Sequence, residues 1–115
     1  MTNQDAVEAL KALAHPVRLK IVQALAGVER NVGEIDAVAE IGQPSLSQQL
    51  AVLRAAGLVQ TRREAKQVFY RLDEQRIEAI GGTIGSLLPD AGRAAHEEIV
   101  RNTPVIGAAR FARLG

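Results

Sequence analysis

Hydrophobic residues recur at three- and four-residue steps through the first half of the chain, and this pattern predicts four short helices. The expected ranges are residues 6–14, 16–26, 33–40 and 43–56. We expect Asp5 to cap the first helix, His15 to cap or turn the chain before the second, and Gly57 to end the fourth. The inward positions of the last three helices are Val17, Ile21, Val22, Leu25, Ile35, Val38, Ala39, Leu46, Leu50 and Leu53.

The pattern changes to a two-residue period after residue 58. Polar and apolar side chains alternate over residues 59–63 and 68–72, on either side of "REAKQ", which predicts a β-hairpin. Asp73 is expected to cap a fifth helix that ends at Pro89. Residues 91–102 allow one more helix before Pro104, and a tail of small residues follows. The order α-α-α-α-β-β-α predicts a mostly α fold with a small β-hairpin, a winged helix-turn-helix.

The fifth predicted helix carries an apolar stripe at helical spacing, formed by Ile77, Ile80, Ile84 and Leu87 or Leu88. Because the stripe follows a complete small domain, we favour a subunit interface across a two-fold axis over an intrachain core. Gly81, Gly82 and Gly85 each cost about 1 kcal/mol inside a helix. We therefore expect close backbone approach in a dimer, or room for a ligand, at these glycines.

Composition limits the classes of protein that remain. The chain has 115 residues, 47% hydrophobic and 23% charged, which fits one compact domain. There is no cysteine, which excludes disulfides, thiolate metal sites, thiol redox sensing and a cysteine nucleophile. No signal peptide precedes the first helix, and no apolar run approaches the roughly 20 residues of a spanning helix, so we expect a cytoplasmic protein.

Charge is distributed unevenly, although the net charge of the chain is only +1. Residues 43–72 carry five basic residues against Glu64 alone, and the segments on either side are slightly acidic. The fourth predicted helix lies in this basic segment and presents glutamine and serine instead of the usual Glu and Lys. Short uncharged hydrogen-bonding groups beside concentrated positive charge indicate a surface that binds a polyanion.

Enzymatic and metal chemistry find little support in the sequence. There is no nucleophile paired with a base, no Gly-rich phosphate loop and no H-E-x-x-H motif. His15 lacks companions at ligand spacing, Asp36 and Glu40 are expected to be a helix-surface pair, and His96 lies on a solvated helix face. We expect no enzyme activity, no metal and no cofactor.

Four stretches together resemble the ArsR/SmtB winged-helix repressors: "LKALAHPVRLKIVQAL", "VGEI", "QPSLSQQLAVLRAAGLVQTRRE" and "VFYRL". The resemblance runs from about Val7 to Leu88, and the third stretch is its most specific part. It implies a homodimeric DNA-binding repressor that leaves its operator when an inducer binds, often a metal ion. We accordingly assign residues 1–88 to a DNA-binding and dimerisation domain and residues 89–115 to a C-terminal extension.

The resemblance also implies roles for individual residues. Those matching the base-reading face are Gln43, Ser45, Ser47 and Gln48, with Gln49 as an extra contact. Those matching phosphate and wing contacts are Arg54, Arg62, Arg63 and Lys66. Those assigned to the dimer interface are Val7, Leu10, Ile77, Ile80, Ile84 and Leu87.

The chain departs from the family pattern at several positions. Gly42 replaces the usual serine before the recognition helix, where it can still cap, and Ala65 replaces a common wing-tip glycine. The amino-acid sequence is most similar to the thiol-sensing branch of this family, but Gln23 and Pro89 occupy the positions where the two cysteines of that branch would lie. Persulfide and disulfide sensing are therefore excluded. A small organic effector between the terminal helices ranks first, ahead of pH, another non-thiol signal, or no effector.

Two hypotheses of different classes follow. The first is a homodimeric transcriptional repressor of a palindromic operator, with two recognition helices in successive major grooves. The second is a winged-helix module for protein interaction or dimerisation without sequence-specific DNA binding. The second leaves the basic middle segment and its uncharged polar helix face without a purpose, so the sequence favours the first.

Overall fold

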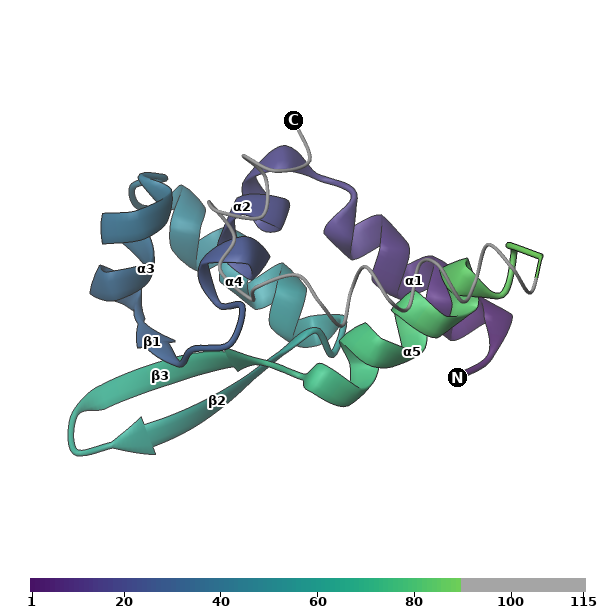
Figure 1. Cartoon of the computed structure of the whole chain (residues 1–115). Helices are drawn as coiled ribbons and strands as arrows, with labels where there is room; N and C mark the ends of the chain where they lie inside the picture. The colour runs from purple at the N-terminus through teal and green to yellow at the C-terminus, as the bar shows by residue number, and fades with distance from the viewer. Residues whose placement is uncertain (90–115) are drawn as a thin grey trace.

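The computed structural model describes residues 1–89, which form five helices and a small sheet with a projecting hairpin (Figure 1). The expected helix at 91–102, His96 and the tail lie outside the described residues. The elements in chain order are α1 (Asn3–Leu13), α2 (Pro16–Ala24), β1 (Arg30–Asn31), α3 (Val32–Ala39), α4 (Ser45–Ala55), β2 (Val59–Glu64), β3 (Gln67–Leu72) and α5 (Glu74–Gly85). The winged helix-turn-helix prediction is confirmed, with β1 as an addition.

Side-chain caps set the beginnings of α1, α2 and α5. Helix α1 begins earlier than expected, because Thr2 is its cap and Asp5 completes a reciprocal capping box from inside the first turn. The hydrogen bond that the Asp5 carboxylate accepts from the Thr2 backbone N–H lowers the pKa of Asp5. His15 caps α2, its Nδ1 accepting from Val17 N–H at 3.1 Å, and Asp73 caps α5, so both of these predictions are confirmed.

Asp36 fixes the turn between α3 and α4. Helix α3 ends at Ala39, and Glu40 adopts a left-handed conformation with φ of 53°. The Asp36 Oδ1 then accepts hydrogen bonds from the backbone N–H groups of Ile41 at 2.9 Å and Gly42 at 2.8 Å. The expectation that Asp36 and Glu40 form a helix-surface pair is wrong, because Asp36 satisfies the backbone of the turn instead.

Helix α4 begins two residues later than the hydrophobic pattern predicted. Pro44 occupies the cap position without a side-chain acceptor, and Gly42 lies before it at φ of +82°. The Gln43 side chain supplies the missing acceptor, because its Oε1 accepts from Ser47 N–H at 3.0 Å. The expectation that Gly42 caps the helix is therefore wrong.

The core lies where α2, α3 and α4 meet the base of the hairpin. Its fully buried large side chains are Ile21, Leu25, Ile35, Leu46, Leu50, Leu53 and Leu58. Val38 was expected inside but is 54% exposed. Helix α3 is only eight residues long and fully buries just Ile35 and Ala39, one helical turn apart, so Val38 points outward.

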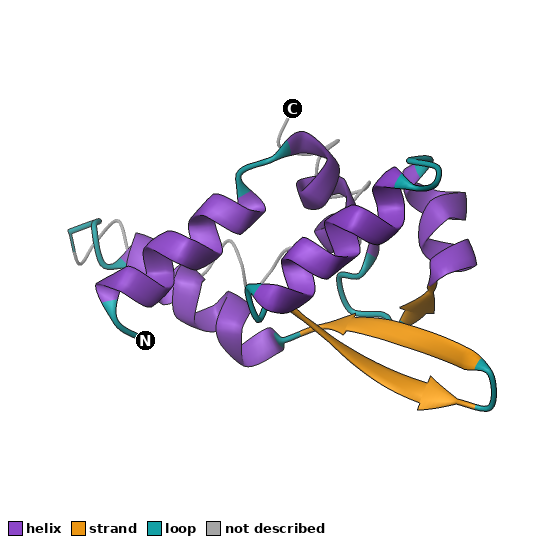
Figure 2. Cartoon of the chain, turned by 180° about the vertical axis from the view of Figure 1, so that it is seen from behind, coloured by secondary structure: helices purple, strands orange, loops and turns teal. Residues whose placement is uncertain are grey.

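A three-stranded antiparallel sheet, in the order β1-β3-β2, carries the hairpin (Figure 2). Strands β2 and β3 pair from Val59 opposite Leu72 to Glu64 opposite Gln67, which leaves Ala65 and Lys66 as the turn. Ala65 has φ of 55°, a conformation that glycine adopts more readily. The two-residue strand β1 pairs with Tyr70 and Phe69 and was not predicted, because no periodicity is readable over two residues.

Helix α5 lies alongside α1 (Figure 1). Ile80 is 5% exposed and belongs to the core, so it offers little surface to a partner. Ile84 is 46% exposed and Leu87, beyond the end of the helix at Gly85, is 77% exposed. Within residues 1–89, a Cβ added at Gly81, Gly82 or Gly85 would meet nothing within 4 Å, so packing among these residues does not require the three glycines. None of the helices within residues 1–89 is long and apolar enough to cross a membrane.

The Asp36 hydrogen bonds lead to a prediction about stability. We expect Asp36→Ala to lower the free energy of unfolding by about 2 kcal/mol, because two backbone donors of a half-buried turn lose a charged acceptor. Asp36→Asn, which keeps the side-chain oxygen, should lose less than half of this. Urea denaturation followed by circular dichroism measures both variants. Equal losses for the two would show that the carboxylate charge, and not the acceptor geometry, holds the turn.

Candidate nucleic-acid interface

The exposed face of α4 brings most of the expected base-reading residues together. The buried leucines of α4 fix its orientation. Gln43, Ser47 and Gln48 are exposed at the beginning of α4, while Ser45 and Gln49 are half-buried on its flanks. A polar, uncharged helix end held against a rigid core is a shape that fits the DNA major groove.

Two of the three glutamines on this face already use their side-chain oxygen inside the protein. Gln43 accepts from Ser47 N–H, and Gln49 Oε1 accepts from the Arg18 guanidinium at 3.1 Å. Arg18 also donates from Nε to the backbone oxygen of Ala12 at 2.6 Å. No sequence pattern pointed to Arg18, because its contact with Gln49 spans 31 residues.

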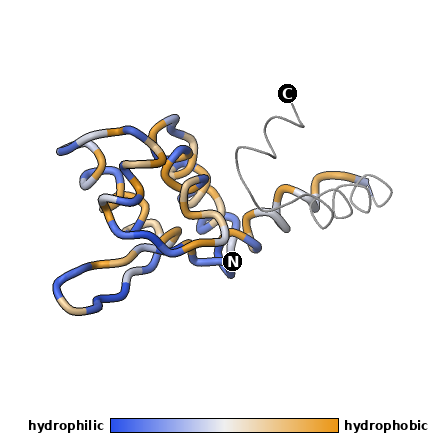
Figure 3. Tube along the Cα trace, turned by 60° about the vertical axis from the view of Figure 1, so that its left-hand side comes forward, coloured by the Kyte–Doolittle hydropathy of each residue, from blue (hydrophilic) through white to orange (hydrophobic). Residues whose placement is uncertain are grey.

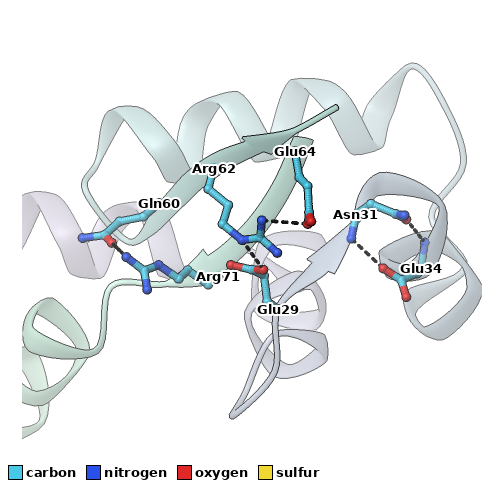
Figure 4. Close-up of polar contacts among 7 residues, drawn as sticks. All are labelled: Glu29, Asn31, Glu34, Gln60, Arg62, Glu64 and Arg71. Carbon is cyan, nitrogen blue, oxygen red and sulfur yellow. Dashed lines mark hydrogen bonds and ion pairs between the residues drawn. The ribbon is translucent and has the colours of Figure 1, made fainter. Parts of the chain in front are cut away.

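Arg62, expected to contact phosphate, is held by two carboxylates (Figure 4). Its Nε lies 2.6 Å from Glu29 Oε1, and its Nη1 lies 2.9 Å from Glu64 Oε2. Its Cζ also lies 4.8 Å from the centroid of the Phe69 ring. The hydrogen bonds to Glu64 and Glu29 raise the pKa of Arg62. Glu29 precedes β1, so folding brings a negative charge into the basic segment from outside it.

The remaining basic residues of the segment have different surroundings. Arg63 and Lys66 are exposed, and strand alternation places Arg63 on the hairpin face opposite Arg62. Arg54 is exposed near the end of α4. Arg71 donates to Gln60 Oε1 at 2.9 Å, at the base of the hairpin (Figure 4). Figure 3 shows hydrophilic colour along one arm of the hairpin and hydrophobic colour along part of the other.

The described residues offer no cluster of metal-ligating side chains. Within residues 1–89, no three His, Cys, Asp or Glu side chains come together in a way that could hold a metal ion. An open cavity of about 650 Å³ lies at the base of the hairpin, between Val28, Leu72 and the beginning of α5. It is lined by residues other than Gly81, Gly82 and Gly85, near which an effector was expected.

Comparison with known proteins identifies relatives of this chain. The family model "Bacterial regulatory protein, arsR family" matches residues 15–61, which include α2, α3, α4 and the beginning of β2. The biofilm growth-associated repressor of Agrobacterium fabrum is 61% identical over 67 residues, which are 58% of this chain and 57% of that protein. The chain thus matches somewhat under three fifths of the length of that relative.

Two further proteins are similar over most of their length. The transcriptional activator HlyU of Vibrio cholerae is 47% identical over 75 residues, which are 65% of this chain and 69% of that protein. A solved structure of HlyU gives a TM-score of 0.63 at 42% identity, covering 76% of this chain and 97% of that one. The homodimeric winged helix-turn-helix DNA-binding domain of Mb0332 from Mycobacterium bovis gives 0.59 at 31% identity, covering 72% and 80%.

Proposed function

This chain belongs to the ArsR family of bacterial regulatory proteins, and from that premise we propose that it is a homodimeric, sequence-specific DNA-binding repressor of transcription. The observation that carries the proposal is the exposed, uncharged polar beginning of α4 beside a basic wing. The family consists of regulators and not enzymes. We place the protein in the cytoplasm, together with the DNA that it would bind.

In the proposed complex, α4 enters the major groove and the wing follows the phosphate backbone. Gln48 is exposed and can present both its amide oxygen and its amide nitrogen to one adenine. Ser45 and Ser47 donate to or accept from neighbouring bases or phosphates. Arg63 and Lys66 contribute most of the wing's phosphate attraction, with Arg54 near the far end of α4. Arg62 contributes less, because two carboxylates already neutralise it.

The proposed dimer forms through α1 and α5. Val7 is 44% exposed on α1, and Ile84 and Leu87 extend the apolar surface along α5 and past its end. Leu10 and Ile77 are half-buried beside them. A two-fold axis through this surface presents two copies of α4, which would read a palindromic operator at half-sites about 34 Å apart.

Release from DNA requires a signal that this chain can sense. The chain has no cysteine and therefore cannot use the thiol chemistry of the family branch that it is most similar to in sequence. We propose a small organic effector instead. Apolar exposure around α1 and α5 favours a ligand that acts by changing the packing of the dimer.

The first test measures discrimination between DNA sequences. We expect the protein to bind the duplex upstream of its own gene at least about a thousandfold more tightly than a scrambled duplex. Gln48→Ala should reduce this ratio by about 5- to 150-fold, because a bidentate adenine contact is lost. Gln75→Ala, an exposed glutamine on α5, is the control and should leave the ratio unchanged. Equal weak binding of both duplexes by the native protein would favour the protein-interaction module instead.

A salt titration tests the assignment of the wing. We expect Arg63→Ala to weaken binding to all duplexes and to reduce the slope of log affinity against log salt by about one unit. Arg62→Ala should change the slope by less than about half a unit, because Glu29 and Glu64 already pair with its charge. A full unit lost in both variants would mean that DNA displaces the two carboxylates from Arg62.

The dimer surface has a test of its own. Leu87→Glu places a charge at a leucine that is 77% exposed and should weaken self-association at least about tenfold. Leu19→Glu, at a 42% exposed leucine on α2, is the matched control and should leave self-association unchanged. Sedimentation equilibrium measures both variants. A dimer that survives Leu87→Glu but dissociates with Leu19→Glu would place the interface elsewhere.

A further inference from the structure

We infer that Gln43, just before α4, and Gln48 and Gln49, within it, read bases by two different rules, and that Arg18 is the positioning residue that sets the rule for Gln49. The inference rests on the proposed DNA-binding function and specifies its base readout. It starts from two hydrogen bonds, Gln49 Oε1 with Arg18 and Gln43 Oε1 with Ser47 N–H. Gln48 has no hydrogen-bonded side-chain partner within the described residues, which makes it the contrasting case.

Chemistry dictates which end of each amide is engaged. A guanidinium group and a backbone N–H can only donate, so the glutamine atom that they contact must be the carbonyl oxygen. The NH₂ group of Gln49 and that of Gln43 therefore remain as the polar atoms available to DNA. One lone pair of each amide oxygen is already occupied inside the protein, whereas neither NH₂ group has a hydrogen-bond partner within the described residues.

Arg18 is held firmly enough to impose this orientation. Its Nε donates to the Ala12 backbone oxygen at 2.6 Å, near the end of α1, while its Nη1 donates to Gln49 on α4. The side chains of Arg18 and Gln49 are half-buried. Rotation of the Gln49 amide would leave a charged donor without its acceptor, which disfavours the reversed orientation.

The two orientations select different bases. A bidentate contact with adenine requires the amide oxygen to accept from N6 while the amide nitrogen donates to N7. Gln48 can meet this requirement. The oxygens of Gln49 and Gln43 are directed to Arg18 and to Ser47 N–H, so these side chains are oriented to donate. They therefore favour guanine, thymine or adenine, which all present major-groove acceptors, and disfavour cytosine, which presents its N4 amine. For each copy of α4 we therefore expect one base position in the DNA that selects adenine, flanked by base positions at which only cytosine is disfavoured.

The test is selection of bound duplexes from a library randomised across the half-site, with the full chain. The position read by Gln49 is identified as the one whose preference disappears in Gln49→Ala. There the native protein should disfavour cytosine and treat the other three bases within a few fold. Arg18→Met removes the donor and frees the Gln49 oxygen, so adenine should gain about fivefold or more over guanine and thymine. Arg18→Lys keeps a donor and should retain the native profile.

Two further variants separate this readout from a loss of folding. In a Gln49→Ala background, Arg18→Met should change no base preference, since a purely structural role for Arg18 would act with or without Gln49. Gln49→Glu keeps the contact with Arg18 but presents an acceptor, and should shift the preference toward cytosine. An unchanged profile in both Arg18→Met and Gln49→Glu would overturn the inference while leaving the proposed function intact. A native protein that selects no sequence would overturn both.

Discussion

The burial of Leu46, Leu50 and Leu53 on one side of α4 is the constraint on which the rest of the molecule depends. Each side chain is at most 1% exposed, and burial of a leucine contributes about 1.5–3 kcal/mol. These three contacts set the rotation of α4 about its own axis, because no other rotation buries all of them. The polar residues between them are consequently turned outward or to the flanks, and the candidate nucleic-acid interface is a result of how the core packs.

Local patterns in the sequence predicted most of the fold. Helices and hairpin follow from hydrophobic spacing, and the caps His15 and Asp73 follow from residue type next to a helix start. Contacts between distant segments were not predictable in this way. Arg18 contacts Gln49, 31 residues away in the sequence, and Arg62 contacts Glu29, 33 residues away. Neither pairing produces a periodic pattern that could be recognised in the sequence. The candidate interface was therefore predictable as a set of residues, but not in the partners that decide what each residue can offer.

Charge counted along the chain overestimates the positive character of the wing. Residues 43–72 carry a net +4, a count that already includes Glu64. Glu29, from outside this segment, also pairs with Arg62. Arg71 is directed to Gln60 at the hairpin base. Among the described residues, the positive charge of the wing that has no carboxylate partner thus lies at the exposed Arg63 and Lys66 instead of being spread along both strands. A modest net charge of this kind favours recognition of sequence over indiscriminate attachment to DNA.

Strand β1 joins the wing to the helix-turn-helix through one residue. Asn31 caps α3, pairs its backbone with Phe69, and donates from Nδ2 to Gln67 Oε1. The same short segment positions Glu29 beside Arg62. Insertions at the wing tip, between Glu64 and Gln67, would leave these attachments in place, whereas insertions between Gly27 and Asn31 would disturb all of them together. Length variation in descendants of this chain should therefore accumulate at residues 65–66 and be rare in the connection after α2.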